Sequence, residues 1–334
     1  MKKKLLACLL AALCLVGMAG GESAEIQERG ETLVPVLELP ELPSGQLVEI
    51  PLDQNSQKIS IPPVEEGYLY AEGEENPYGY VDPSITVNIG TGRRDDTNYI
   101  YARVKIASAS QLRTLMASPV GHQSTTPGHD LAKRVQAVLA INGDWPGGDS
   151  YTKRAKGALM RQGKLLRKVN CDGKWDVLVI DGNGDLKILP KARNADVEAA
   201  MEDAVQIFTF GPGLVIDGQP NEDLGNIDIG MNKQAQRMAI CQTGPLEYLL
   251  LTTEGPEDPG SVGMTVPQFV ELISSFPEVI NAYNLDGGSS STMVFRKGGK
   301  NWRKINAPNN TKIRPLKDII YFASAWEQED SVGE

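Results

Sequence analysis

Short apolar runs that alternate with polar residues predict strands along most of the chain from residue 80 onwards. Residues 85–89 and 99–106 alternate as two strands, and the polar residues 91–98 form the turn between them. Two more hairpins are predicted where apolar residues flank the turn sequences RQGK and DGNGD. The remaining strands are predicted from apolar runs at 138–141, 214–216, 238–241, 248–252, 279–285 and 318–323.

The clearest helix is predicted at residues 265–276. Thr265 is the expected N-cap, Gln268 completes a capping box, and Pro277 ends the helix. Apolar residues recur at helical spacing and predict one buried face. That face consists of Val266, Phe269, Val270 and Ile273.

This helix joins two predicted strands in a βαβ-like crossover, which places the ends of both strands at one edge of the sheet. Those ends carry Glu254 and Asp286, so we expect the two carboxylates at the same edge, where they could face one another. Shorter helical patterns occur at 131–138 and 195–205. Together these elements predict an α+β fold, with a mixed, mostly antiparallel sheet and flanking helices in a single large domain.

Four segments are expected along the chain. Residues 1–20 combine three lysines, an apolar run and small residues, which is typical of a secretory signal peptide and too short for a permanent membrane span. We therefore expect a secreted or cell-surface protein. Residues 21–76 are rich in Pro and Glu and predict an extended spacer. Residues 77–326 form the expected folded domain, and residues 327–334 an acidic tail.

Charge and composition exclude several classes of partner. The formal net charge is −10, and loss of the three lysines in the first 20 residues makes it −13. Such a surface repels nucleic acid and anionic membranes. No fingerprint of an ATP-binding or NAD-binding loop is present, so no nucleotide cofactor is expected. Cys171 and Cys241 follow the signal, and whether they pair is left open.

The stretch with the most chemistry is NLDGGSSST, at Asn284–Thr292. A predicted strand delivers this loop to a sheet edge, where a ligand can reach it. Gly287 and Gly288 allow positive φ and a close approach to a ligand, so backbone N–H groups and hydroxyls could cradle an anion beside Asp286. The alternative is a hairpin turn in which Asp286 bonds its own backbone. The hydroxyl groups are those of Ser289, Ser290, Ser291 and Thr292.

Polar residues at other strand ends are candidates for the same site. Asn142, Gly143 and Asp144 form a polar corner suited to sugar hydroxyls or a water molecule, or else an ordinary NG turn. Arg237 stands before a strand, where its guanidinium could clamp phosphate or be a surface charge. Glu254 ends the neighbouring strand as a second carboxylate.

The C-terminal segment and the two histidines provide fewer candidate site residues than the strand ends do. Asn306 and Arg314 are polar residues in a turn-rich segment, and Arg314 precedes a proline that favours an extended conformation. His122 and His129 fit no recognised ligand spacing, so no metal site is expected there. The Asp286 carboxylate with neighbouring Ser and Asn oxygens would suit calcium or magnesium, and a metal at Asp286 is kept as an alternative to a cofactor-free site.

The segment Leu285–Thr292 resembles the LDGG motif of the phosphodiester glycosidase family. Other blocks resemble that family in the same order, and the similarity covers about residues 80 to 325. These blocks are AINGDW at 140–145, FGPGLVIDG at 210–218, RMAI at 237–240, GMTVPQFVELI at 263–273, Asn306, and RPLKDIIY at 314–321.

The resemblance implies a hydrolase that cleaves the glycosidic bond of a sugar 1-phosphodiester, in a glycosyl-phosphate conjugate or a cell-wall or exopolysaccharide polymer. It implies that Asp286 is the nucleophile or base, with Glu254 or Asp144 as its carboxylate partner. Two alternatives stay open: a phosphodiesterase that attacks phosphorus, and a non-catalytic glycan or cell-wall binding module. The implied substrate-binding residues are Asn142, Gly143, Arg237, Gly287, Gly288, Ser289, Ser290, Thr292, Asn306 and Arg314.

Overall fold

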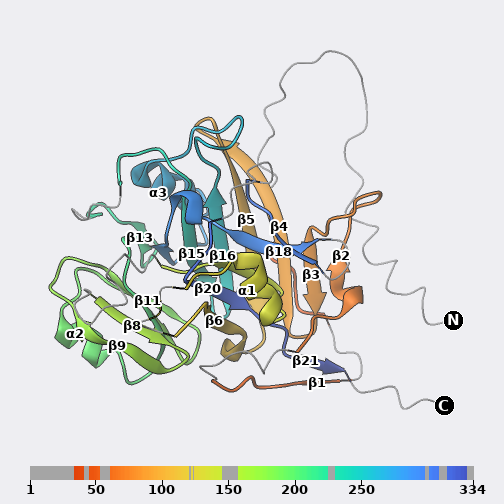
Figure 1. The fold of residues 1–334 in the computed structure, drawn as a ribbon, viewed down its shortest axis with the longest axis horizontal. Helices are drawn as coiled ribbons and strands as arrows, with labels where there is room; N and C mark the ends of the chain where they lie inside the picture. The colour runs from red at the N-terminus through yellow and green to blue at the C-terminus, as the bar shows by residue number, and fades with distance from the viewer. Residues whose placement is uncertain are drawn as a thin grey trace.

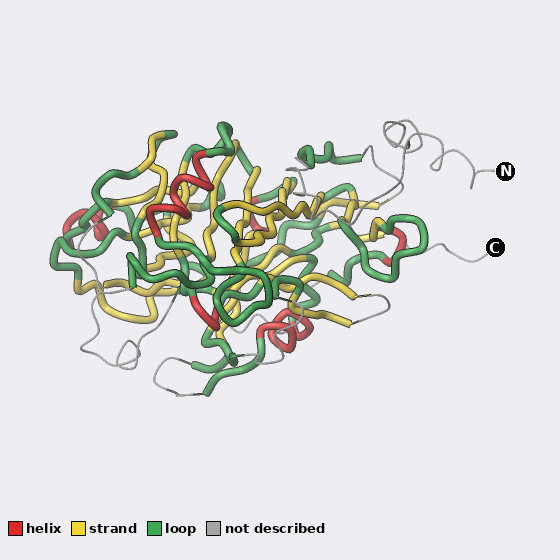
Figure 2. Tube along the Cα trace, turned by 90° about the horizontal axis from the view of Figure 1, so that it is seen from above, coloured by secondary structure: helices red, strands yellow, loops and turns green. Residues whose placement is uncertain are grey.

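The computed structural model describes residues 34–40, 45–52, 61–119, 122, 124–144, 157–224, 230–297, 301–307 and 314–328. The expected signal peptide and the end of the acidic tail lie outside these residues. Strands are the main regular structure, drawn as the yellow segments in Figure 2, and they form several sheets that lie close together (Figure 1).

The largest sheet has nine strands, and every neighbouring pair in it is antiparallel. From one edge to the other, its strands are β14 (Gln219–Pro220), β13 (Gly213–Ile216), β17 (Asn281–Asn284), β15 (Met238–Gly244), β16 (Glu247–Thr253), β5 (Thr97–Ile106), β4 (Ile85–Arg94), β3 (Gly79–Asp82) and β2 (Tyr68–Leu69).

Two five-stranded sheets and one two-stranded sheet complete the β-structure. The first five-stranded sheet consists of β19 (Asn301–Lys304), β18 (Met293–Lys297), β7 (Leu139–Asn142), β20 (Asp318–Phe322) and β6 (Leu112–Met116). The second consists of β11 (Leu186–Leu189), β10 (Val177–Asp181), β12 (Ala204–Phe208), β8 (Gly157–Arg161) and β9 (Lys164–Asn170). The two-stranded sheet pairs β1 (Gly45–Leu47) with β21 (Trp326–Gln328).

Helices are few and short. Within the described residues there are three α-helices: α1 (Gly128–Arg134), α2 (Asn194–Ala199) and α3 (Val266–Ser274). Three single-turn 3-10 helices accompany them: η1 (Glu65–Gly67), η2 (Ala109–Gln111) and η3 (Gly288–Ser290). The α+β fold class predicted from the sequence is therefore wrong, because the protein is mostly β.

The physical reason for this error lies in the two weaker helical patterns. The pattern at 131–138 gives only α1, which has seven residues, and the pattern at 195–205 gives only α2, which has six. Helices of about two turns are not stable by themselves and form only where a sheet face covers their apolar side. They cap the sheets and do not build a layer of their own.

Helix α3 forms where the sequence predicts the clearest helix. The Thr265 hydroxyl accepts the Gln268 N–H, and the Gln268 side chain completes the predicted capping box. The helix connects β16 to β17, and both strands pair antiparallel with β15 between them. Strands β16 and β17 are therefore parallel to each other, and their C-terminal ends lie at the same edge of the nine-stranded sheet.

The main core lies between the nine-stranded sheet and the two five-stranded sheets. Alternation along the strands divides the side chains: Met238 and Ile240 of β15 face this core, whereas Ala239 and Cys241 face α3. Helix α1 packs on the outer face of the sheet that contains β7 and β20, and α2 packs on the sheet that contains β8 and β10. Each helix thus covers the outer face of one sheet.

The described residues that precede the main sheet run along the domain surface. The Val34 N–H donates to the Tyr101 hydroxyl, and the Asn88 amide donates to the carbonyl of Pro35. Further along, β1 pairs with β21, and Ile50 is buried against the sheet that contains β20. This part of the segment expected as a spacer is extended and bound to the domain.

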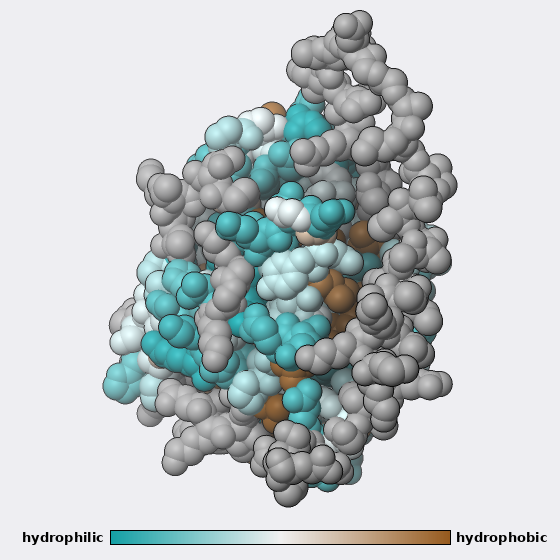
Figure 3. Space-filling view, turned by 90° about the vertical axis from the view of Figure 1, so that its right-hand side faces the viewer, coloured by the Kyte–Doolittle hydropathy of each residue, from teal (hydrophilic) through white to brown (hydrophobic). Residues whose placement is uncertain are grey.

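Figure 3 shows that the side of the molecule near β2 and β3 is mainly hydrophilic, with separate apolar residues. No α-helix in the described ranges has the length and apolar character needed to cross a bilayer. Cys171 and Cys241 are both buried free thiols, so the disulfide left open by the sequence does not form.

Candidate active site

Asp286 lies at the sheet edge that the α3 crossover creates, two residues after the end of β17. Its backbone N–H donates to the carbonyl oxygen of Gly143 at 3.3 Å. This bond joins the end of β17, in the nine-stranded sheet, to the end of β7, in a five-stranded sheet. The polar corner predicted at 142–144 and the loop predicted at 284–292 therefore meet.

The Asp286 carboxyl is partly buried, and this burial raises its pKa to about 6. The Ser290 hydroxyl and the positive charge of Arg314 act in the opposite direction. The Gly287 N–H also lowers the pKa, whereas the charge of Asp144 raises it. A carboxyl group with a pKa in this range exchanges its proton near neutral pH, as a catalytic acid or base must.

Asn142 holds the start and the end of the serine-rich loop together. Its amide donates to the carbonyl of Asp286 at 2.8 Å, and its amide oxygen accepts the Thr292 N–H at 2.9 Å. The side chain is fully buried. Because its donor and acceptor are both used inside the protein, Asn142 shapes the loop and does not present its amide to a sugar.

Asn306 has the same function at the far end of the loop. Its amide donates to the Ser291 carbonyl at 2.9 Å, and its amide oxygen accepts the Met293 N–H at 2.7 Å. Asn306 is also fully buried. Two asparagines that are distant in sequence thus fix four backbone groups of the loop, which is the kind of support that keeps a site preorganised.

The two glycines of the loop have different functions. Gly288 has a φ of +58°, the left-handed conformation that favours glycine. Gly287 has a φ of −109°, so the positive φ expected there does not occur. A side chain on Gly287 would meet the carbonyl oxygen of Gln236 at 2.8 Å. Gly287 is therefore needed because the backbone of the entry to β15 lies against it.

Of the four hydroxyl residues in the loop, Ser290, Ser291 and Thr292 are buried, so Ser289 is the one whose hydroxyl a ligand can reach. The Ser289 side chain is partly exposed, and the Ser290 hydroxyl is bonded to Asp286. The predicted nest of N–H groups is largely occupied by bonds within the protein. These bonded N–H groups are those of Gly288, Ser290, Ser291 and Thr292.

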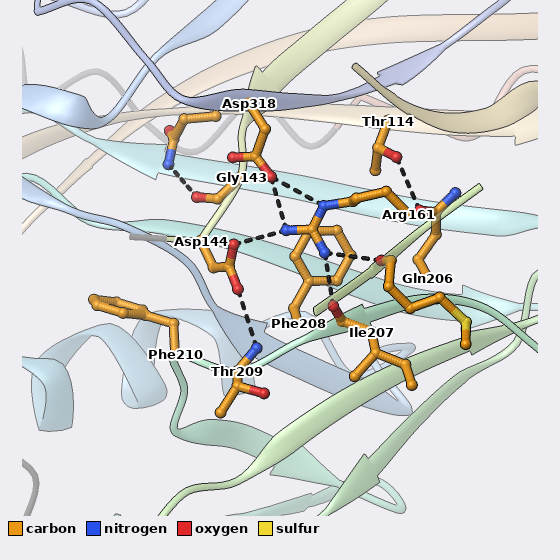
Figure 4. A network of polar contacts seen from close by, with 12 residues as sticks. Thr114, Gly143, Asp144, Arg161, Gln206, Ile207, Phe208, Thr209, Phe210 and Asp318 are labelled. Carbon is orange, nitrogen blue, oxygen red and sulfur yellow. Dashed lines mark hydrogen bonds and ion pairs between the residues drawn. The ribbon is translucent and has the colours of Figure 1, made fainter. Parts of the chain in front are cut away.

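Asp144 belongs to a buried ionic network that Figure 4 shows. One of its carboxylate oxygens accepts Arg161 at 2.7 Å, and the other accepts the Thr209 N–H at 3.0 Å. Arg161 also donates twice to one oxygen of Asp318, at 2.7 and 3.0 Å. The Arg161 guanidinium lies over the ring of Phe208, 3.8 Å from its centre. One cation therefore joins two carboxylates beside Asp286.

Neither Arg161 nor Asp318 is singled out by a motif or a spacing in the sequence. Arg161 ends β8 and is followed by a turn, where an arginine is usually exposed. Asp318 was visible only as part of the block RPLKDIIY. The one feature that could have indicated Asp318 is its position in that block, directly before the four apolar residues of β20.

Arg237 lies at the same sheet edge, but its side chain belongs to another network. Its guanidinium donates to the carbonyl oxygens of Met264, Gly230 and Lys233. Strand alternation places it on the α3 side of β15. Burial lowers its pKa to about 10, and no carboxylate within the described ranges forms an ion pair with it.

Glu254 is also held away from Asp286. Its carboxylate accepts the Asn98 amide at 2.9 Å and the Ser261 hydroxyl at 2.8 Å. Lys304, which the sequence did not indicate, lies near this group, and burial lowers its pKa while Asp258 and Glu254 raise it. The shared sheet edge is thus observed, but Glu254 and Asp286 have separate partners.

The structure divides the candidate residues into two groups. The first group surrounds the carboxyl group of Asp286 and consists of Gly143, Asp144, Ser290 and Arg314. The second group consists of Arg237 and Glu254, whose side chains bond to other residues. Arg314 is exposed, and no ion pair to it occurs in the described part of the chain. Within that same part, no group of three or more His, Cys, Asp and Glu residues is arranged to hold a metal ion.

Comparison with known protein families gives one match. The model of the phosphodiester glycosidase family matches residues 135–323, which is more than half of the chain. The matched range contains Asn142, Asp144, Arg161, Asp286 and Asp318. No curated protein matches the chain.

Among solved structures, the zebrafish N-acetylglucosamine-1-phosphodiester alpha-N-acetylglucosaminidase catalytic domain, auto-inhibited by its pro-peptide, is similar with a TM-score of 0.55 and 15% identity. The match covers 84% of this chain and 96% of that chain. A hypothetical protein from Synechocystis has a TM-score of 0.48 and 15% identity, and the match covers 73% of this chain and 63% of that chain. A putative exported protein from Burkholderia pseudomallei has a TM-score of 0.42 and 15% identity, and the match covers 68% of this chain and 74% of that chain.

Proposed function

The chain belongs to the phosphodiester glycosidase family, and on this premise we propose that it hydrolyses the glycosidic bond of a sugar 1-phosphodiester. The products are the free sugar and a phosphomonoester. The observation that carries the proposal is the Asp286 carboxyl, which is partly buried at a sheet edge between a serine hydroxyl and an exposed arginine. This arrangement places a titratable carboxyl group next to groups that bind an anion.

The phosphate of the substrate is proposed to lie against Arg314 and Ser289. Arg314 forms no ion pair within the described residues, although its charge acts on Asp286, and a guanidinium suits the geometry of phosphate oxygens. Ser289 adds a partly exposed hydroxyl. A phosphate leaving group is a weak base, so the site gains most by stabilising the negative charge that develops on the departing oxygen.

Asp286 is proposed to act at the anomeric carbon, either as the nucleophile or as the base that activates a water molecule. In both cases the bond from the anomeric carbon to the phosphate oxygen breaks, and an oxygen from water is finally attached to the sugar. Asp144 is the better carboxylate partner, because its charge acts on Asp286. Glu254 is bonded to Asn98 and Ser261 instead.

The substrate is proposed to lie outside the cytoplasm. The first 20 residues have the pattern of a secretory signal, and a glycosyl-phosphate conjugate or a cell-wall or exopolysaccharide polymer would be met there. The net charge of −10 repels polyanions at long range, so the phosphate depends on local groups such as Arg314.

Hydrolysis in heavy-oxygen water tests the proposal. The purified protein is incubated with a sugar 1-phosphodiester, and both products are analysed by mass spectrometry. We expect the label in the sugar. Label in the phosphate would show attack at phosphorus and reject the glycosidase. Absence of turnover over a panel of such substrates, with glycan binding that survives Asp286→Asn, would favour a non-catalytic binding module.

A further inference from the structure

Asp318 and Arg161 are buried directly behind the proposed active site, and the reaction described above uses neither of them. Arg161 donates two hydrogen bonds to one oxygen of Asp318 and one to Asp144. It also donates to the carbonyl oxygens of Met160 and Ile207. These bonds and the contact with the Phe208 ring hold the guanidinium and its charge in one position (Figure 4).

Gly143 alone separates Asp318 from the backbone of Asp286. The Gly143 N–H donates to the Asp318 carbonyl, and the Gly143 carbonyl accepts the Asp286 N–H, both at 3.3 Å. A side chain at position 143 would collide with the Asp318 carboxylate. The absence of a side chain therefore lets the Asp318 carboxylate pack against the residue to which Asp286 is bonded.

We propose that Asp318, held by Arg161, is a positioning residue that determines the pH at which Asp286 loses its proton. The inference rests on the proposed function, because it assigns Asp286 the role of base or nucleophile. It assigns Asp318 no contact with the substrate. Its effect on the reaction passes through the charge that it places next to Asp286.

The charges around Asp286 support this arrangement. The charges of Asp144 and Arg314 act on Asp286, and the charge of Asp286 in turn acts on Asp318, whose carboxylate is paired with Arg161. Burial, together with the charges of Asp144 and Asp286, raises the pKa of Asp318 to about 6, although Arg161 acts to lower it. Carboxyl groups that interact in this way titrate as a set, so a change in one shifts the ionisation of the others.

The first test is the pH profile of kcat/KM for Asp318→Asn. This variant keeps the size of the side chain but removes one negative charge beside Asp286. We expect the acidic limb of the profile to move to lower pH by about 1 unit. Asp318→Ser makes the same charge change with a smaller side chain and is expected to move the limb in the same direction. A limb that stays at the parental pH in both variants would overturn the proposal.

Asp82→Asn is the matched control. Asp82 is also a buried aspartate with several hydrogen-bond donors, among them Ser84 and Ser324, and it lies near the other end of β20. Its replacement removes a buried carboxylate and is expected to reduce stability without moving the acidic limb. A shift as large as that of Asp318→Asn would show that loss of any buried carboxylate is sufficient and would contradict the inference.

A second readout needs no substrate and separates this inference from the proposed function. The free energy of unfolding is measured against pH for the parent and Asp286→Asn, and the difference between the two curves reports the ionisation of Asp286. The same pair is then made in the Asp318→Asn background. We expect the step in the difference to move from near pH 6 to lower pH. An unmoved step would overturn the inference even if no enzymatic activity were found.

Discussion

Two buried arginines lie close to the same sheet edge, and their surroundings differ. Arg161 is 3% exposed and Arg237 is 4% exposed. Arg161 joins the carboxylates of Asp144 and Asp318. Arg237 donates to backbone carbonyls, including those of Met264 and Gly230, and no described carboxylate pairs with it. One charge is neutralised by carboxylates, and the other is solvated by peptide dipoles.

The difference shows that the function of a buried arginine depends on which groups it is bonded to. Arg161 fixes two carboxylates next to Asp286 and so acts on the ionisation of the site. Arg237 donates to Gly230 and Lys233, which precede β15, and to Met264, which precedes the N-cap of α3. It therefore holds these two segments together at the sheet edge. Its role as a phosphate clamp stays a prediction, and the experiments below that compare arginine variants test it.

The largest expected effect is on stability, from Arg161→Met. This change leaves two buried carboxylates without their shared cation, which costs on the order of 3 to 5 kcal/mol. Arg237→Met removes a cation that has only neutral partners and is expected to cost less, about 1 to 3 kcal/mol. Urea unfolding at pH 7 measures both variants. Equal losses would contradict the comparison.

Asp286→Asn is expected to reduce kcat by about 10²- to 10⁴-fold, because the proton-transferring or nucleophilic oxygen is lost. Initial rates on a sugar 1-phosphodiester measure the loss. The matched control is Asp181→Asn, which changes an aspartate of β10 whose carboxylate accepts the N–H groups of Asn183 and Asp185. This control is expected to retain parental kcat.

Asp286→Asn is also expected to change how the free energy of unfolding depends on pH. Because the pKa of Asp286 is raised from 3.8 to about 6 in the folded protein, the folded state binds more protons than the unfolded state between these values. Stability contributed by Asp286 therefore falls as the pH rises through this window. Asp286→Asn cannot ionise, so it should be more stable than the parent above pH 6 by on the order of 2 to 3 kcal/mol. An unchanged difference from pH 4 to 8 would refute the raised pKa.

A smaller effect is expected from Arg314→Ala. The side chain is exposed, so the free energy of unfolding should change by less than about 0.5 kcal/mol. Loss of a phosphate contact should raise KM about tenfold, which corresponds to about 1.4 kcal/mol. Arg314→Lys keeps the charge but not the planar donors and should have an intermediate KM. Parental KM in both variants would exclude Arg314 from substrate binding.

An effect of similar size is expected when inorganic phosphate stabilises the protein. At a phosphate concentration ten times its Kd, the gain is about 1.4 kcal/mol. We expect Arg314→Ala to abolish this gain and Arg237→Met to preserve it, as measured by thermal unfolding with and without phosphate. The reverse pattern would place the anion at Arg237.

Local signals in the sequence predicted part of this structure well. Thr265 and Gln268 predicted the start of α3 because a capping box needs only neighbouring residues. The crossover from β16 to β17 followed from that helix, and it correctly placed Glu254 and Asp286 at one edge. The fold class was wrong because two short apolar patterns form helices of only six and seven residues against sheets.

The partners of the candidate residues could not be predicted in the same way. The sequence predicts Asn142 as a sugar ligand, but its amide bonds to the backbone of Asp286 and Thr292, about 150 residues away. Arg161 meets Asp318 across 157 residues. Such pairs depend on how separate sheets pack, and no local spacing in the chain indicates them.

The most direct measurement is a crystal structure of the protein with a sugar 1-phosphate bound. The account predicts phosphorus next to Ser289 and Arg314, with the anomeric carbon facing the Asp286 carboxyl. Phosphorus beside the Arg237 guanidinium, or a sugar bound with its anomeric carbon away from Asp286, would contradict it.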